Sequence, residues 1–515
     1  MSFILSVDVG STTVSAAIFD EKGERVSFSS SKYEYISPSP GLAEIDPSHL
    51  WDTLLKVIKD VIAKGNLGAS DLNTFGISSQ RGTFILWDRD SGKPYINFIS
   101  WLDNRADQIA KDINNGLVRL GVNAVGSIGY AFTGAKRTIL AKILNVKGIY
   151  ACTKVGWAIQ NIPEVARAHD EGRLMFGSID SWLVHKLTKG KLHVTDYSFA
   201  SSTAMWDPFQ RDWSGLIKWL CGIKSMVFPS YTDSIGDICI VDKEWFGAEF
   251  PVNALIGDQM ASMFAANCFE KGDMLCSMGT GMFISCNTGS YVHASLSGLY
   301  PQVAWKHGEE VVYMCEGQAK GISASIEWAK KIGYFDDVSE TAAIAKSVPD
   351  SDGICFVPGF FGLETPYQDE LSCAGLLGIR STSTKAHIVR AILEAIAFRF
   401  YEIHLCSISE IQVPFRSLIK ICGGVSQNDF VLELMSALTN CTIVRVKHAK
   451  EMTVRGAAYM AGIGAGIFSS KEDVIPFLQS DKEVHPDQAL RKIYLEKYNT
   501  WKKAVEKCLS WYPSK

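Results

Sequence analysis

The chain has 515 residues, of which 47% are hydrophobic and 21% are charged, and its formal net charge is −4. This length exceeds what one hydrophobic core supports, so we expect two or more domains. The slightly acidic balance argues against nucleic acid or an anionic membrane as the main partner. No apolar run predicts a membrane span or a signal peptide. The thirteen cysteines include no CxxC pair, which indicates free thiols and a cytoplasmic protein.

A predicted three-stranded antiparallel meander opens the chain. Its strands cover residues 3–8, 14–19 and 25–30. A plain hairpin turn needs only Gly or Asn, whereas the first turn here adds the carboxylate of Asp8 to Gly10 and a run of hydroxyl residues. The hydroxyl residues are Ser11, Thr12 and Thr13. Such groups suit a phosphate and its metal ion, although Asp8 could instead cap the turn and the threonines could serve strand formation.

A helix and a buried strand follow the meander. Asp46 is suited to the N-cap, Pro47 to the first helical position and Gly65 to the stop. The apolar run at 73–79 predicts a buried strand, and further α/β alternation follows.

The second half begins near residue 253 and repeats this theme. A strand ending at Met278, a bend at Gly279-Thr280-Gly281 and a strand ending near Asn287 form a second strand–glycine–strand unit with a hydroxyl in the bend. Such self-similarity indicates duplicated domains whose loops face one cleft. Two unrelated glycine turns are the alternative.

A third glycine loop lies within residues 418–438, where Gly423 and Gly424 join an apolar strand to an amphipathic helix. Paired glycines at such a turn let the backbone approach a ligand closely. No P-loop pattern GxxxxGK[ST] is present, and GIGAG at 462–466 favours close helix packing instead. Two phosphate hairpins and a Gly-Gly loop favour the actin-like ATPase architecture.

These motifs resemble those of the FGGY carbohydrate kinases, and within that family the glycerol kinases. The resemblance covers nearly the whole chain. Its motifs in the first half are DVGSTT (8–13), SSQRGT (78–83), SWLDNRA (100–106) and TKVGW (153–157). Those in the second half are GDQMASMF (257–264), MGTG (278–281), VPGFFGLETPY (357–367), GGVSQNDF (423–430) and GAAYMAG (456–462).

The resemblance implies an α/β fold of two ribonuclease-H-like domains, of the actin/hexokinase ATPase type, with ATP and substrate in the cleft between them. The expected domains are residues 1–252, with the substrate site and the first phosphate loop, and residues 253–515, with the nucleotide site and the catalytic Asp.

The resemblance also implies a role for each polar residue in phosphoryl transfer from ATP. Asp258 would be the base that takes the proton of the substrate hydroxyl, and Asp8 would hold Mg²⁺ through water. The residues implied to hold the substrate hydroxyls are Gln80, Arg81 and Gln259, together with Asp258. The residues implied to contact the nucleotide are Ser11, Thr12, Thr13, Thr280, Gly424 and Asn428.

Several of these residues have structural alternatives. Asp258 and Asn428 could each be the N-cap of the helix that follows. Arg81 could be a solvated surface charge. The segment 101–105, with its Trp, Asp and Arg, could support the substrate loop or contact the substrate directly.

The chain departs from the glycerol kinases around the substrate. Those enzymes carry a Glu at the position of Gly82, and the loss of that acceptor would cost about 1–3 kcal/mol of substrate binding. Their substrate Tyr aligns with Ile149, next to Tyr150, and the region 115–150 differs in length and content. The absent carboxylate predicts a larger and less polar pocket, which would admit a bigger polyol or sugar.

The sequence therefore predicts an ATP- and Mg²⁺-dependent kinase that phosphorylates a hydroxyl of a small polyol, with glycerol, giving glycerol 3-phosphate, as the leading candidate. A kinase for another polyol or a keto-sugar is one alternative, and a catalytically weak nucleotide-binding regulator is another. Retention of Asp8, Asp258, Thr280 and Gly424 argues against the weak homologue. We expect no nucleic-acid partner and no membrane span, and a homodimer is the candidate assembly.

Overall fold

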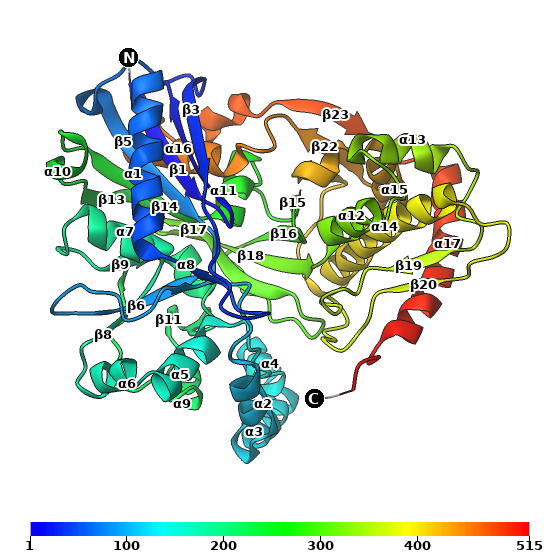
Figure 1. Ribbon diagram of the computed structural model, residues 1–515, viewed down its shortest axis with the longest axis horizontal. Helices are drawn as coiled ribbons and strands as arrows, with labels where there is room; N and C mark the ends of the chain where they lie inside the picture. Colours follow the sequence, from blue (N-terminus) through cyan, green and yellow to red (C-terminus); the bar gives the residue numbers. More distant parts are fainter. Residues whose placement is uncertain (1, 514–515) are drawn as a thin grey trace.

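Two twisted sheets, one in each half of the chain, form the body of the molecule (Figure 1). The computed structural model describes residues 2–513. The strands of the first sheet, in spatial order, are β13 (Ile235–Ile240), β14 (Pro251–Gly257), β5 (Leu72–Ser79), β1 (Phe3–Val9), β2 (Thr13–Phe19) and β3 (Arg25–Lys32). Those of the second are β17 (Tyr300–His307), β18 (Glu310–Ala319), β16 (Met282–Gly289), β15 (Met274–Met278), β21 (Leu418–Cys422), β22 (Thr442–Val446) and β23 (Ser480–Val484).

The two sheets share one pairing pattern. In the first sheet, β3, β2 and β1 pair antiparallel, and β1, β5 and β14 pair parallel. In the second sheet, β18, β16 and β15 pair antiparallel, and β15, β21 and β22 pair parallel. On the parallel side of each sheet, the edge strand is antiparallel to its neighbour; this strand is β13 in the first sheet and β23 in the second. The repeated pattern confirms the predicted pair of ribonuclease-H-like units. The predicted boundary after residue 252 falls within β14, and it stays a prediction.

The predicted local elements of the first half are confirmed. The meander consists of β1, β2 and β3, and the helix is α1 (Pro47–Lys64). The side chain of Asp46 caps this helix by accepting hydrogen bonds from the backbone N–H groups of Ser48 and His49, both at 2.8 Å. These bonds satisfy donors that the first helical turn leaves unpaired.

Helices cover both sheets. In the second half they are α11 (Asp258–Ala265), α12 (Ile322–Lys331), α13 (Thr341–Lys346), α14 (Lys385–Glu410), α15 (Asp429–Thr439), α16 (Met452–Gly464) and α17 (Gln488–Cys508). Those of the first half besides α1 are α2 (Asp107–Asn115), α3 (Leu117–Thr133), α4 (Lys136–Lys142), α5 (Ala151–Asn161), α6 (Pro163–Asp170), α7 (Ile179–Leu187), α8 (Tyr197–Ser201), α9 (Gly215–Leu220) and α10 (Lys243–Phe246). Between residues 2 and 513, no helix is long and apolar enough to cross a membrane.

Helix α16 comes late in the chain but packs on the first sheet. A Cβ atom added at Gly76 of β5 would lie 2.2 Å from the carbonyl oxygen of Ala457 in α16. The same addition at Gly456 of α16 would lie 1.9 Å from the carbonyl oxygen of Ala261 in α11. Glycine therefore allows α16 to contact both a strand and a helix closely. The packing predicted for residues 462–466 is confirmed in the same way, since a Cβ at Gly462 would lie 2.5 Å from the ring of Phe468.

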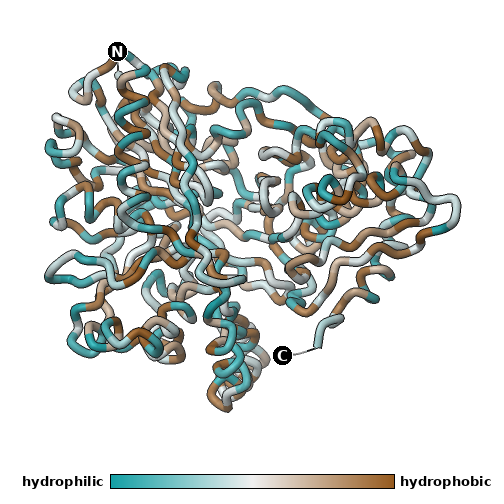
Figure 2. The backbone as a smooth tube through the Cα atoms, in the orientation of Figure 1, coloured by the Kyte–Doolittle hydropathy of each residue, from teal (hydrophilic) through white to brown (hydrophobic). Residues whose placement is uncertain are grey.

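The first half also contains a small sheet and the helices α2 to α6, which lie beside its main sheet. The small sheet has four strands. Its strands, in spatial order, are β4 (Glu44–Ile45), β7 (Phe98–Ile99), β6 (Phe84–Asp88) and β8 (Leu174–Ser178). The helices α2, α3 and α4 project from the body at the bottom of Figure 1. Figure 2 shows hydrophobic residues at the lower tip of this projection.

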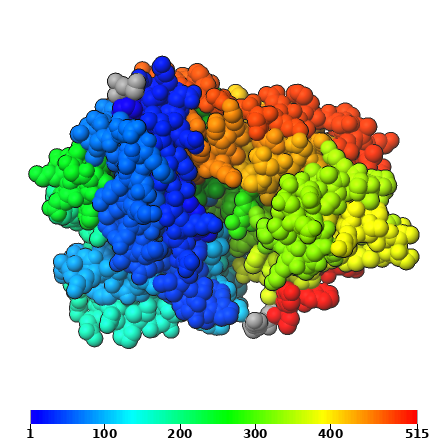
Figure 3. Space-filling view, turned by 45° about the horizontal axis from the view of Figure 1, so that its top comes forward, coloured from blue at the N-terminus to red at the C-terminus, as the bar shows by residue number. Residues whose placement is uncertain are grey.

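Short strand pairs complete the fold. They are β9 (Val194–Asp196) with β12 (Ser230–Thr232), β10 (Trp206–Asp207) with β11 (Asp212–Trp213), and β19 (Cys355–Val357) with β20 (Gly375–Leu377). Figure 3 shows that the face toward the viewer is hollowed between the blue first half and the yellow-green and orange second half, with green segments of the middle of the chain deeper in the hollow.

Candidate active site

A cavity of about 280 Å³ lies between the two halves. It brings together six of the residues predicted for the site, which are Ser11, Gln80, Arg81, Asp258, Gln259 and Thr280. Gly82, Trp101, Ile149 and Tyr150 also line it, as do Gln302 and Glu316 of the second sheet. The cavity therefore joins the predicted substrate residues of one half to the Gly-Thr-Gly turn of the other.

Asp258 stands at the start of α11, directly after the parallel strand β14. The N-cap of this helix is Gly257 rather than Asp258. The Oδ1 atom of Asp258 accepts hydrogen bonds from its neighbour Gln259 N–H at 2.7 Å and from Nε of Arg81 at 3.2 Å. Burial raises the pKa of Asp258 above its usual range, and the positive charge of Arg81 opposes that rise. The carboxylate is thus held in place and is more basic than an exposed Asp.

Arg81 belongs to the cavity wall, and with 11% of its side chain exposed it is not a solvated surface charge. Its Nη2 atom donates to both oxygens of Glu316, at 2.9 and 3.1 Å. Its Nη1 atom donates to Oε1 of Gln302. One guanidinium therefore ties Asp258 to two neighbouring strands of the second sheet, with the two-pronged geometry that arginine offers to a carboxylate.

Sequence reasoning missed Glu316 and Gln302. Glu316 is buried, and burial raises the pKa of its carboxyl group while Arg81 opposes that rise. The sequence did carry a signal for Glu316, because this residue is the one charged residue in the mainly apolar run VVYMCEGQA at 311–319. A buried acid in a strand needs a partner, and Arg81 is that partner.

The two predicted glutamines have different surroundings. Gln80 is buried, and its amide N–H groups donate to Tyr33 at 2.9 Å and to the carbonyl oxygen of Gly10 at 3.3 Å. It therefore supports the turn at Gly10. The side chain of Gln259 makes no hydrogen bond to any other residue between 2 and 513, so its amide is available to a ligand in the cavity.

The segment 101–105 combines support and contact. Asp103 is fully buried and accepts hydrogen bonds from Ala43 N–H and from Arg105. Arg105 also pairs with Glu44 at 2.7 Å. Trp101 lines the cavity, and its indole N–H donates to the hydroxyl of Ser11 at 3.0 Å. The Asp and the Arg thus fasten the loop, and the Trp presents a ring to the cavity.

Asp8 lies near the end of β1, and only one of its two carboxylate oxygens has a hydrogen-bond partner. Its Oδ2 accepts a hydrogen bond from Thr453 of α16 at 3.0 Å, whereas its buried Oδ1 has no partner in the described chain. Burial, followed by the nearby charge of Asp258, raises the pKa of Asp8 to about 7. A cation beside this carboxylate would compensate both for the burial of its negative charge and for the repulsion by Asp258.

The carboxylate oxygens of Asp8 fit a magnesium ion. Among residues 2–513, no three His, Cys, Asp or Glu side chains gather into a metal cluster. Mg²⁺ is commonly held by one or two carboxylates, with water and substrate phosphates as its other ligands. The unpaired oxygen of Asp8 suits that mode of binding.

The two glycine hairpins end beside the cavity. Thr12 and Thr280, one from each turn, are exposed. Neither hydroxyl makes a hydrogen bond to another described residue, so both are available to a phosphate. Thr13 lies in β2, paired with Lys32 of β3, as its strand alternative predicted.

A second pocket, of about 420 Å³, lies on the second half and contains Gly424 and Asn428. Gly423 has φ of +95°, and a Cβ there would lie 2.3 Å from the carbonyl oxygen of Met278, so glycine is required at that position. A Cβ at Gly424 would meet nothing within 4 Å, which leaves its backbone open to the pocket. Asn428 caps α15 by accepting from Val431 N–H at 3.2 Å, the alternative that the sequence left open.

The two pockets are linked through the Gly-Thr-Gly turn. Ser323, which lines the second pocket, donates its hydroxyl hydrogen to the carbonyl oxygen of Gly279, which lines the first. A ligand that extends from the Gly424 loop past this turn would reach the cavity that holds Asp258.

Comparison with known proteins gives the family of the chain. The model of the FGGY family of carbohydrate kinases, N-terminal domain, matches residues 3–265, and that of the C-terminal domain matches residues 274–465. The chain is 39% identical to glycerol kinase 5 of Danio rerio, with 99% of this chain and 97% of that protein covered. It is 32% identical to glycerol kinase 2 of Thermotoga maritima, with 99% of each covered.

Solved structures give the same result. The glycerol kinase of Plasmodium falciparum with ADP superimposes with a TM-score of 0.87 at 28% identity, over 99% of this chain and 98% of that one. A gluconate kinase of Lactobacillus acidophilus has a TM-score of 0.83 at 20% identity, over 98% of each chain, and shows the fold alone. The family resemblance of the motifs is thereby confirmed.

Proposed function

The chain belongs to the FGGY family of carbohydrate kinases, and from that premise we propose that it transfers the terminal phosphoryl group of ATP to a hydroxyl of a small polyol. Glycerol, giving glycerol 3-phosphate, is the first candidate because relatives across the whole length carry the name glycerol kinase. The observation that carries the proposal is the convergence of Asp258, Arg81, Gln259 and Thr280 on one cavity.

Asp258 acts as the general base in this proposal. Its Oδ1 atom is occupied by Arg81 and by the N–H of Gln259, while its Oδ2 accepts no hydrogen bond from another described residue. A carboxylate with a raised pKa is a better acceptor for the proton of an alcohol. Arg81 and the amide of Gln259 orient the remaining substrate hydroxyls.

The phosphate side is divided between the halves. Ser11, Thr12 and Thr13 contact the phosphates from the first half, and Thr280 contacts the γ-phosphate from the second. Asp8 would hold Mg²⁺, which when bound neutralises phosphate charge. The backbone at Gly424 receives the adenosine end, and Asn428 sets the start of the helix beside it.

The division of labour between residues 1–252 and 253–515 is part of the same proposal. We also assign the protein to the cytoplasm, since all thirteen cysteines are free thiols and such thiols persist in a reducing compartment. A homodimer is proposed as the assembly, and light scattering of the purified protein tests it.

One assay tests the function. Purified protein is incubated with Mg²⁺ and ATP, and ADP release is followed against glycerol, longer polyols and keto-sugars. We expect release that depends on glycerol and Mg²⁺, with the product identified as glycerol 3-phosphate. Release with a keto-sugar but not with glycerol would move the proposal to that substrate, and no release with any acceptor would overturn it.

A further inference from the structure

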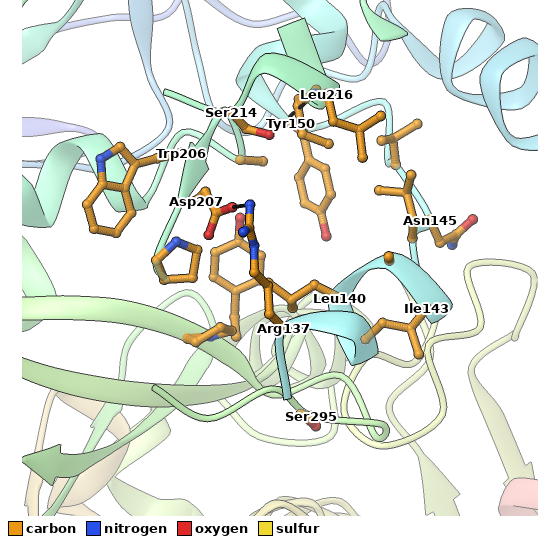
Figure 4. Close-up of a pocket in the computed structure, with 18 of the residues that line it drawn as sticks. Arg137, Leu140, Ile143, Asn145, Tyr150, Trp206, Asp207, Ser214, Leu216 and Ser295 are labelled. Atoms are coloured by element: carbon orange, nitrogen blue, oxygen red, sulfur yellow. Dashed lines mark hydrogen bonds and ion pairs between the residues drawn. The ribbon is translucent and has the colours of Figure 1, made fainter. Parts of the chain in front are cut away.

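A larger cavity adjoins the one that holds Asp258. Its volume is about 720 Å³. Figure 4 shows residues that line it. We call it the apolar chamber. The residues that line both cavities form its neck, and they are Lys147, Tyr150, Gly298, Tyr300 and Gln368. The shared residues show that the chamber and the candidate active site are neighbours.

The walls of the chamber are mainly apolar. They come from α4 and the segment after it, from α9 and from the loop before β17, and they include Leu140, Leu216 and Leu299. The charges of Arg137 and Asp207 at one side are paired with each other at 2.9 Å. A hydroxyl-rich sugar would lose its hydrogen bonds to water in such a space. An alkyl, acyl or aryl group would gain free energy by leaving water there.

The size of the chamber also exceeds what a small polyol needs. Cavities of about 300–1,000 Å³ hold ligands as large as drugs, and glycerol is far smaller than these. The 280 Å³ cavity beside Asp258 already offers space for the reacting end of a substrate. The chamber therefore suits a second part of the same molecule.

The neck offers aromatic and polar side chains that a ligand can contact. The ring centroids of Tyr150 and Tyr300 are 6.3 Å apart with planes at 49°, and Figure 4 shows the Tyr150 ring pointing into the chamber. Neither phenol forms a hydrogen bond with another described residue. Lys147 Nζ donates to Oε1 of Gln368 at 2.9 Å, and an ammonium group has further hydrogens to donate.

We propose that the substrate is a polyol that carries one apolar group through an ether or ester oxygen. This inference rests on the proposed function and names its substrate class. The free hydroxyl lies at Asp258, the linking oxygen accepts a hydrogen bond from Lys147, and the apolar group occupies the chamber. The hydroxyl oxygen forms the new bond to phosphorus, the bond from the γ-phosphorus to the bridging oxygen breaks, ADP leaves, and Asp258 takes the proton.

The first test compares glycerol with its 1-O-ethyl, butyl and hexyl ethers as acceptors. A methylene group that leaves water contributes at most about fourfold to affinity. We therefore expect KM to fall along the series, by at least about tenfold between glycerol and the butyl ether. A KM that stays flat or rises with chain length, while glycerol itself is phosphorylated, would overturn the inference and leave the kinase proposal intact.

The second test places a charge in the chamber wall. Leu216 is 40% exposed at the chamber, so Leu216→Asp is compatible with folding. It should lower the ratio of kcat/KM for the butyl ether over glycerol by about tenfold or more. Leu117→Asp is the matched control, because Leu117 is 85% exposed on α3 and lies outside the chamber lining. Equal effects of the two variants on the ratio would contradict the inference.

Calorimetry separates the two proposals if turnover is absent. Binding of the same ethers is measured with Mg²⁺ and ADP present. Affinity that rises with chain length in the wild type and not in Leu216→Asp supports the chamber even when the kinase proposal fails. Tight binding of an ether that only inhibits glycerol phosphorylation would overturn the substrate assignment.

Discussion

The first and second glycine hairpins share a backbone design and differ in charge. In each, a glycine N–H closes the turn on a carbonyl two or three residues on, with Gly10 bonded to Thr13 at 3.0 Å and Gly279 to Gly281 at 2.9 Å. Only the first hairpin follows a carboxylate, Asp8, whose Oδ1 lacks a partner. The duplicated fold thus repeats the glycine turn, while the carboxylate that suits a metal occurs once.

The two turns are also anchored differently. Gln80 and Tyr33 hold the carbonyl oxygen of Gly10 within the first half. Ser323 holds that of Gly279, and Gly423 lies against Met278. The first turn is therefore anchored to residues of the first half, and the second to residues beside the Gly424 pocket. Changes at the two turns should separate the roles proposed for them.

The largest effect is expected from replacing Asp258, the proposed base. Asp258→Asn should lower turnover at least about a hundredfold, because general-base catalysis contributes roughly 10²–10⁴-fold. Affinity for ADP, measured by calorimetry, should hardly change, since the Gly424 pocket is on another loop. Asp107→Asn, at the first residue of α2, is the control. Turnover close to normal in Asp258→Asn would refute the mechanism.

The next largest effect should distinguish the two turns directly. Thr280→Val and Thr12→Val each remove a hydroxyl that would donate to a phosphate, a bond worth about 1.5–3 kcal/mol to a charged acceptor. We expect a loss of roughly 10- to 100-fold in kcat/KM for ATP, mainly in kcat for Thr280→Val and mainly in KM for Thr12→Val. Thr500→Val, at an exposed position of α17, is the control. The same kinetic change in both variants would mean that the turns are equivalent.

A smaller effect is expected at Gly82, which lines the cavity that holds Asp258. Gly82→Glu restores a carboxylate acceptor and should raise the kcat/KM ratio for glycerol over larger polyols several-fold. The φ of Gly82 is +74°, so any other residue there adds about 1–2 kcal/mol of backbone strain, and the melting temperature should fall. Gly82→Ala shares the strain without the carboxylate. If the kcat/KM ratio for glycerol over larger polyols changes equally in both variants, the carboxylate at this position does not determine substrate preference.

The smallest effect concerns stability and pH at the first hairpin. The pKa of Asp8 is raised from 3.8 to about 7 in the folded protein, so the folded state holds a proton that the unfolded chain releases. The contribution of Asp8 to stability is therefore greatest at low pH and decreases as the pH rises through this window. Between pH 5 and about 8, the melting temperature of the ligand-free wild type should fall more than that of Asp8→Asn. Parallel curves would contradict the raised pKa, and Mg²⁺ with ADP should reduce the difference.

Sequence patterns predicted the elements that depend on local chemistry. The meander, α1 with its Asp46 cap and the Gly-Gly turn all follow from apolar periodicity and turn residues, and the repeated pairing of the sheets follows from the two hairpins. Which glycine of the pair is required was not predictable, because it depends on the carbonyl of Met278, which comes from a distant strand.

The parts of the site that sequence patterns missed depend on contacts between distant segments. Glu316 pairs with Arg81, which is 235 residues earlier in the chain, and only the fold brings them together. The apolar chamber is built from three separate segments whose leucines have no distinctive pattern. By contrast, Asp258 and Thr280 could be predicted as site residues because each follows a strand end within a recognisable motif.

The position of α16 has a consequence for how the chain is made. The strand β5, with Gly76, leaves the ribosome early, whereas Ala457, which covers it, is synthesised near the end. Until then the apolar face of the first sheet lacks its covering helix, and Asp8 lacks the hydroxyl of Thr453. The first half therefore completes its packing only when almost the whole polypeptide has been translated. A gene fragment that encodes the first half alone would yield a nascent protein with an exposed sheet, which is a substrate for chaperones and proteases rather than an independent domain.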